Sequence, residues 1–339
     1  MKKLITLFFL MCAMMTSLHA QAPLKNASKL ARTGSFVSEV MKASSRIQAD
    51  RSRAIHRLTS QGQLANQWRR LAALKLKGQT DSILKEALIL SESTRSQIDE
   101  MQRSLYVKSQ LLTCYAYRRK KDYAAAYLLA MELMKSKLTE TERAQVNEAY
   151  AYNGYFFATT FARQDSTGHA DYAQARALCE EVLPYAPAYL KAYIEPKIPL
   201  HWYLEATQNH RDQKYEEALT AYGHAREGFA ALGIYSNEVK TICNIAYIKT
   251  MFMCKDEARQ LYAQALAQSR QHGLDSMQMA VLIDTWKFGK NVGDLPLMRA
   301  SATSMDSLAE ITVRPGIKYN YYIHKGNEKK RKNLVHIAE

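Results

Sequence analysis

Asp122-Tyr123-Ala124-Ala125-Ala126 decides the fold of this chain, because the pattern returns at a nearly constant interval. It returns as Asp171-Tyr172-Ala173-Gln174-Ala175 and as Lys214-Tyr215-Glu216-Glu217-Ala218. An upstream copy ends at Ala87, and weaker copies end at Ala258 and Met298. From Ala87 onward, successive copies end 39, 49, 43, 40 and 40 residues apart. A period of about forty residues is typical of stacked helical repeats.

The spacing of apolar residues is helical almost throughout, and strand-like alternation is missing from the sequence. We therefore expect an all-α fold built from paired helices joined by turn residues such as Gly78 and Gly293. The predicted pairs are 64–77 with 81–95, 100–119 with 122–136, 143–162 with 170–183, 199–211 with 214–231, 237–253 with 255–271, and 276–289 with 294–309.

Two irregularities interrupt the period. Residues 163–169 form a loop that lengthens one repeat by about nine residues, which accounts for the step of 49. Four of the seven prolines fall in 184–199. Because proline is excluded from helix interiors, this segment predicts a bend or an extra short helix around 188–194. It is either an elbow between two halves that rock or a rigid corner.

The N-terminus has the form of an export signal. Lys2 and Lys3 precede an apolar run over 4–15, and cleavage sites fit after Ala20 or Ala22. A short membrane anchor is the alternative. We assign 1–22 to a signal peptide and 23–43 to a flexible lead-in, and we expect a soluble periplasmic protein. Four cysteines remain after processing, and they are expected to be buried free thiols: Cys114, Cys179, Cys243 and Cys254.

The net charge of +15 lies at the two ends of the chain. The balance is +10 over residues 23–77 and +5 over 313–339, whereas residues 78–312 carry about −2. This distribution and the export signal argue against nucleic acid as a partner. The basic ends suit an acidic partner or an anionic membrane surface, or they are solvated tails.

The sequence lacks the motifs HExxH, GxxxxGK[ST] and GxSxG. His201, His210 and His224 cluster loosely, but cysteine or carboxylate ligands do not accompany them at metal-site spacing. We therefore expect no enzyme activity, no cofactor and no metal.

The repeat resembles the tetratricopeptide repeat (TPR) over about residues 60–310. Small residues mark the expected helix crossings at Gly154 and Ala246 and at the alanines that end the motif copies. Trp202 and Pro187 fall at the family's tryptophan and proline positions. The resemblance implies a right-handed superhelical solenoid of about six helix-turn-helix repeats within 44–310. Because the period of about forty residues exceeds the 34 of the family, the helices or the linkers between them are expected to be longer than usual.

An exported TPR array is also similar to the periplasmic input region of bacterial membrane sensors. Residues 311–339 then have two interpretations. Residues 315–326 read like the first helix of a further repeat and the pattern is lost from 327, as in a truncated or frame-shifted sensor. Alternatively, these residues form a basic capping tail.

In TPR arrays the first helix of each pair lines the concave face. Alignment on the motif alanines places a tyrosine ladder there with basic residues beside it. The candidate partner-binding residues are Tyr115, Tyr155, Tyr203, Tyr247, Lys108, Arg118, Arg119 and His210. This surface suits an extended peptide or an acidic chain terminus. The alternative is that the rings pack between adjacent repeats.

We therefore expect a non-catalytic module that binds a protein or peptide, as the sensory or scaffold part of an envelope signalling system. A glycan-binding cell-surface protein on a TPR-like scaffold is the alternative, which requires exposed tryptophan platforms. The sequence leaves the oligomeric state open.

Overall fold

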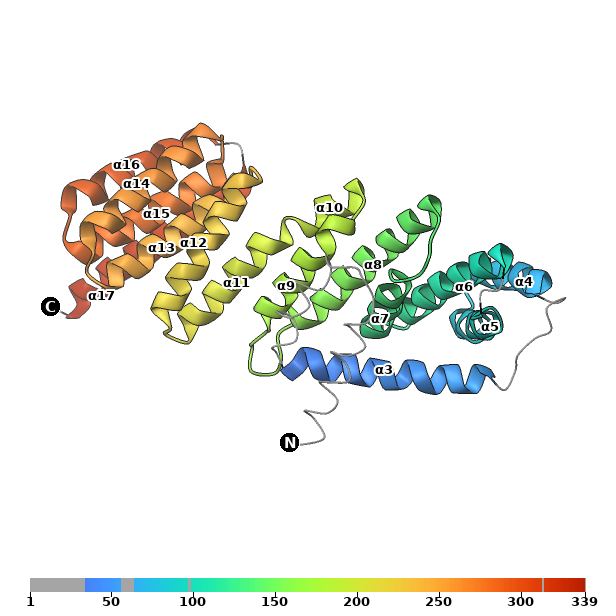
Figure 1. The fold of residues 1–339 in the computed structure, drawn as a ribbon. Helices are drawn as coiled ribbons and strands as arrows, with labels where there is room; N and C mark the ends of the chain where they lie inside the picture. Colours follow the sequence, from blue (N-terminus) through green and yellow to red (C-terminus); the bar gives the residue numbers. More distant parts are fainter. Residues whose placement is uncertain (1–33, 56–63, 97–98, 313, 339) are drawn as a thin grey trace. The chain divides into compact units, whose positions relative to one another are not determined.

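The computed structural model describes residues 34–55, 64–96, 99–312 and 314–338, and every regular element in them is a helix (Figure 1). The expected all-α helical-repeat solenoid is confirmed. The chain divides into two compact units, Met1–Lys197 and Ile198–Glu339. The predicted signal peptide and the lead-in up to residue 33 lie outside the described residues.

In the first unit, three predicted pairs are present as consecutive packed helices. A short 3₁₀ turn, Leu183–Tyr185, and the helix α10 follow them, so the extra helix predicted from the prolines is confirmed. The helices are α3 (Gly34–Ile55), α4 (Leu64–Leu76), α5 (Thr80–Ser93), α6 (Glu100–Arg119), α7 (Tyr123–Leu133), α8 (Glu140–Phe161), α9 (Tyr172–Val182) and α10 (Ala188–Ile194).

In the second unit the remaining predicted pairs are also present. The helices are α11 (Lys197–Arg211, starting at the last residue of the first unit), α12 (Tyr215–Ala231), α13 (Tyr235–Met251), α14 (Lys255–Gln271), α15 (Asp275–Val292), α16 (Leu295–Ile311) and α17 (Pro315–Ala338). The expected loss of pattern after residue 326 does not end α17. Residues 328–332 are Glu, Lys and Arg, which are good helix formers.

The repeated motif combines a turn, a helix cap and a close helix crossing. The motif-ending alanines at 87, 126, 175, 218 and 258 are fully buried. Asp122 and Asp171 start their helices by accepting hydrogen bonds from the backbone N–H groups of Ala125 and Gln174. The residue before the cap is left-handed in several repeats, as at Lys121 with φ 62°. Each copy thus ends one helix and starts the next.

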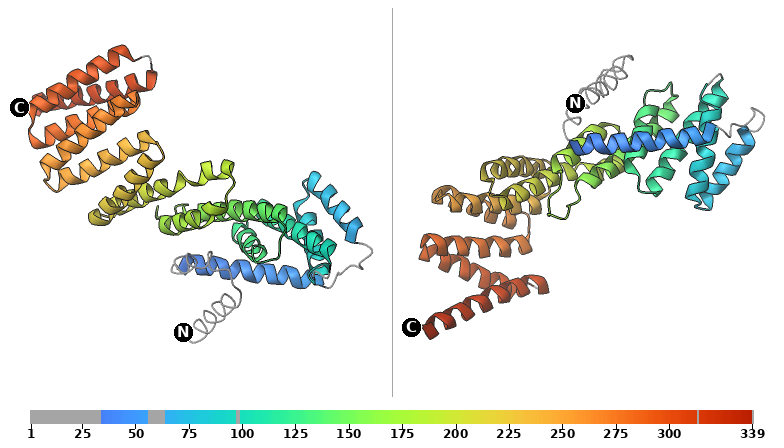
Figure 2. Two further views of the ribbon diagram at one scale, coloured as in Figure 1. Left: turned by 45° about the horizontal axis from the view of Figure 1, so that its top comes forward. Right: turned by 90° about the horizontal axis from the view of Figure 1, so that it is seen from below.

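One expectation was wrong. The flexible lead-in was placed over 23–43, but residues 34–43 belong to α3, which lies alongside α5 and α7 (Figure 2). The apolar residues Phe36, Val40, Ala43 and Ile47 recur at helical spacing, and Ala43 and Ile47 are buried. The many Ser, Lys and Arg residues between them hide this period in the sequence.

Candidate partner-binding surface

In the first unit, cationic side chains lie over aromatic rings along α4, α6 and α8. The Lys75 Nζ atom is 5.6 Å from the centre of the Tyr115 ring, and the Lys108 Nζ atom is 5.8 Å from that of Trp68. Together with the residues described next, these form what we call the aromatic–cation strip: Trp68, Lys75, Lys108, Tyr115, Arg118, Glu148, Tyr152 and Tyr189.

The strip follows from helical spacing. Lys108, Tyr115 and Arg118 are seven and three residues apart, which places them on one face of α6. Trp68 and Lys75 are likewise seven apart on α4. Because α4, α6 and α8 are the first helices of successive pairs, the stack brings their equivalent faces next to one another.

Arg118 is the centre of the strip. Its guanidinium carbon lies 5.5 Å from the centre of the Tyr115 ring and 4.4 Å from that of Tyr152. Its Nη1 atom donates to Asn153 Oδ1 at 3.5 Å. The side chain is half-buried. A guanidinium placed between two rings keeps its charge and still has N–H groups with which to bind a carboxylate.

Tyr189 adds a further ring from α10. Its hydroxyl donates to Glu148 Oε1 at 2.6 Å, and 53% of the residue is exposed. This hydrogen bond to a carboxylate raises the pKa of Tyr189 to about 12. Glu148 is four residues before Tyr152 on α8, and its carboxylate is held at the strip by this contact.

The structure brings together three of the five residues predicted in this unit, namely Lys108, Tyr115 and Arg118. Arg119 is exposed in the last turn of α6. Tyr155 is half-buried with its ring centre 5.5 Å from that of Phe156, and burial raises its pKa.

The other three predicted residues lie in the second unit. The Tyr203 hydroxyl accepts from Asn244 Nδ2 at 3.1 Å, and its ring packs on Tyr222. Tyr247 is 50% exposed, and its ring centre is 5.6 Å from that of His210, whose pKa is lowered by burial. The predicted ladder is thus divided between two units, with two tyrosines in each.

Sequence reasoning did not find five residues of the strip, namely Trp68, Lys75, Glu148, Tyr152 and Tyr189. Tyr152 could have been found, because it lies three residues before the predicted Tyr155 on one face of the same helix. Tyr189 lies on the extra helix α10, outside the register of the motif alanines, so alignment on them gives no signal for it.

Within residues 34–55, 64–96, 99–312 and 314–338, no three His, Cys, Asp or Glu side chains gather as a metal site requires. In the same part of the chain, no helix is both long and apolar enough to cross a membrane.

No protein-family model matches this chain, and no curated protein matches it. Among solved structures, the chain is similar to the crystal structure of BtubC (BKLC) from P. vanneervenii. The identity is 16%, and the match covers 70% of this chain and 94% of that chain with a TM-score of 0.33. At this TM-score the likeness carries no argument about function.

Proposed function

We propose that this chain is a non-catalytic interaction module of the TPR type, which holds an extended acidic peptide on the aromatic–cation strip of its first unit. The observation that supports this proposal most directly is the half-buried guanidinium of Arg118 between the rings of Tyr115 and Tyr152. Such a group binds a carboxylate with little loss of side-chain freedom, because packing already fixes it.

The composition of the strip indicates the chemistry of the ligand. Lys75, Lys108 and Arg118 supply three cations, and Glu148 supplies the one carboxylate, which Tyr189 already binds. Carboxylates of a peptide would pair with the cations, and its apolar side chains would lie against the four rings. Because exposed charges carry part of the affinity, binding should weaken as salt is raised.

The proposal for where the protein acts in the cell rests on its N-terminal sequence. The apolar run after Lys2 and Lys3 and the small residues Ala20 and Ala22 support export to the periplasm. A repeat array that binds peptides there would serve as the sensory or scaffold part of an envelope signalling system.

The test uses fluorescein-labelled ten-residue peptides in which glutamate alternates with leucine, compared with versions in which lysine replaces glutamate. The R118A and Y152A variants should each weaken binding of the glutamate peptide by about ten-fold with unchanged melting temperature. R163A, which removes an exposed arginine from the loop after α8, is the matched control.

Equal binding of the two peptides, or equal loss in R118A and R163A, would contradict the proposal. Soluble glycans form a second arm of the experiment. Binding of a glycan, with no binding of either peptide, would favour the glycan-binding alternative.

A further inference from the structure

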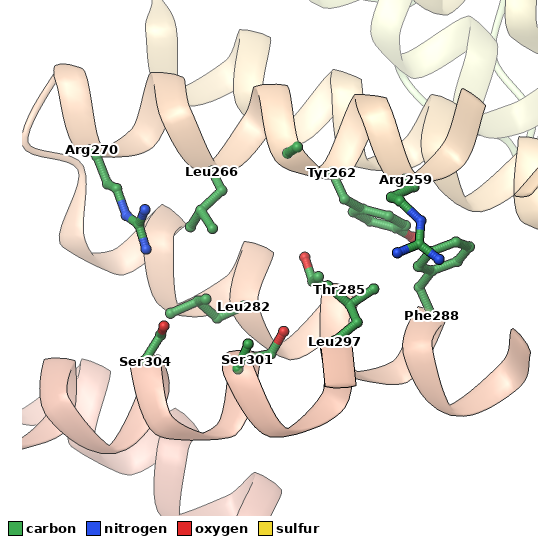
Figure 3. A pocket seen from close by; sticks show the side chains of 12 residues that line it. Arg259, Tyr262, Leu266, Arg270, Leu282, Thr285, Phe288, Leu297, Ser301 and Ser304 are labelled. Atoms are coloured by element: carbon green, nitrogen blue, oxygen red, sulfur yellow. The ribbon is translucent and has the colours of Figure 1, made fainter. Parts of the chain in front are cut away.

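The second unit contains a pocket of about 250 Å³ between α14 and α16, with α15 as its floor (Figure 3). Leu266 and Tyr262 of α14 face Leu297 of α16 across it, and Leu282 and Thr285 rise from the floor. Arg259 and Arg270 lie at opposite ends. We call this site the α14–α16 pocket.

The α14–α16 pocket occupies the same register as a filled site in the first unit. Ala263 follows Ala258 by five residues, as Glu92 follows Ala87. Ser304 follows Met298 by six residues, as Glu132 follows Ala126. On the floor, Leu282 and Thr285 precede Met298 by 16 and 13 residues, as Gln110 and Thr113 precede Ala126. Helices α14, α15 and α16 therefore correspond to α5, α6 and α7.

In the first unit, a helix occupies this register. Arg51 of α3 enters between α5 and α7, where its Nη2 atom lies 2.9 Å from Glu132 Oε2 and its Nε atom 3.7 Å from Glu92 Oε1. The Arg51 side chain is largely buried. The fold thus shows how an added amphipathic helix covers this face of a repeat.

The charges are reversed in the second unit. Alanine and serine replace the two glutamates, and the twelve described residues that line the pocket include two arginines and no acid. Arg259 is bound by Asp294 at 2.6 Å. Arg270 forms no ion pair within the part of the chain that the structure describes. The site therefore lacks the carboxylates that hold α3 and offers a cation instead.

We propose that the α14–α16 pocket docks an amphipathic helix of a partner protein, which seats an apolar side chain over Leu282 and Thr285 and presents a carboxylate to Arg270. Arg259 and Arg270 are eleven positions apart on α14, which corresponds to roughly 16 Å, so a helix of about three turns covers the site. The α3 helix of a second copy fits poorly, because its Arg51 would find neither glutamate.

The test uses the full chain and a labelled, lactam-stapled 15-residue helix with leucines at positions 4, 8 and 11 and flanking glutamates. Fluorescence anisotropy compares it with the same peptide carrying lysines in place of the glutamates. The acidic peptide should bind at least about ten-fold more tightly. R270E should abolish this preference, whereas R299E, at an exposed arginine of α16 outside the pocket lining, should change the affinity less than about two-fold.

A double substitution gives the reverse test. A263E/S304E places in the second unit the pair of glutamates that the first unit has at this register. The double variant should therefore bind the acidic peptide more weakly and should bind a peptide with the α3 sequence, Gly34–Ile55. R118A should leave both results unchanged, which separates this proposal from the function proposed for the first unit.

Absence of binding by the acidic peptide, or equal effects of R270E and R299E, would overturn the proposal. Sedimentation of the chain alone supplies the other outcome. Self-association that R270E abolishes would show that the pocket binds a second copy of this chain. That result would also overturn the proposal of a helix from a partner protein.

Discussion

Arg46 of α3 binds Asp122 at two points, with Nε 2.6 Å from Oδ2 and Nη2 2.8 Å from Oδ1. The same Oδ1 atom accepts the backbone N–H of Ala125 at 3.2 Å, which caps the start of α7. A single carboxylate of the repeated motif therefore starts one helix and holds another. Ser35 repeats the arrangement one repeat later, where its hydroxyl donates to Asp171 at 3.1 Å.

This double role predicts a graded loss of stability. D122N keeps the cap and loses the ion pair, and since Arg46 is 46% exposed the cost should be at most about 1 kcal/mol. D122A also loses the cap, which adds about 1 kcal/mol. Urea unfolding of the two variants measures the difference. The double variant R46A/D122N should lose less unfolding free energy than the sum of the losses in the two single variants. Strictly additive losses would argue against a stabilising Arg46–Asp122 ion pair.

A buried carboxyl group should make the first unit sensitive to pH. Glu181 is buried and accepts from Tyr127 at 2.7 Å and from Tyr150 at the same Oε1 atom. Burial raises the pKa of Glu181 above the ordinary value of 4.5, although the two tyrosine hydrogen bonds oppose this effect. The folded state then binds more protons than the unfolded state, so this contribution to stability is present below pH 4.5 and is lost as pH rises through the folded pKa.

E181Q should therefore flatten the decline in unfolding free energy as the pH rises above 4.5, as measured by urea titrations at a series of pH values. E180Q is the matched control, because Glu180 is the neighbouring residue and is exposed. The idea fails if E180Q and E181Q have the same pH profile.

Close helix crossing should make the substitution of Gly154 destabilising. A Cβ atom at Gly154 would clash with Val182 Cγ1 and lie 3.2 Å from the Tyr127 ring. G154A should thus destabilise the first unit by about 1–3 kcal/mol. Gly223 lies within α12 with open space around it, so G223A should be neutral or stabilising by up to about 1 kcal/mol. Thermal unfolding that ranks the two variants in the opposite order would contradict the packing at this crossing.

Thiol reactivity should distinguish the cysteines. Burial raises the pKa of Cys114, Cys179 and Cys243 to about 12, whereas Cys254 is partly exposed. The fifth cysteine, Cys12 of the N-terminal apolar run, is replaced by serine for this test. Ellman's reagent at pH 8 should then label one thiol quickly and three only on unfolding. C254S should remove the fast phase, and a fast phase that persists in C254S would show that a buried thiol is accessible.

The helix pairs could be predicted because the motif is a local signal. The alanine, the acidic cap and the turn residue lie within six positions, and each has its own physical requirement. Helix α3 could not be assigned in the same way. Its position depends on Asp122 and Asp171, which lie 76 and 136 residues further along the chain from Arg46 and Ser35.

The candidate site was predictable only in part. Alignment on the motif alanines placed Lys108, Tyr115 and Arg118 on one face, and the structure brings them together. The alignment gives Tyr155 on α8, whereas the ring that meets Arg118 is that of Tyr152, three residues earlier on the same helix. The α14–α16 pocket has no sequence signature of its own and emerges only by comparison with the site of Arg51.

The contacts of α3 also set an order of events during synthesis. Ser35 leaves the ribosome 136 residues before Asp171, its hydrogen-bond partner. At 5–20 residues per second, that interval lasts on the order of ten seconds. Helix α3, the first helix in the part of the chain that the structure describes, therefore completes its contacts only after the cap of α9 has been made. Until α8 has been made, the Phe36 ring, which packs against Phe157 and Phe161, is open to a chaperone.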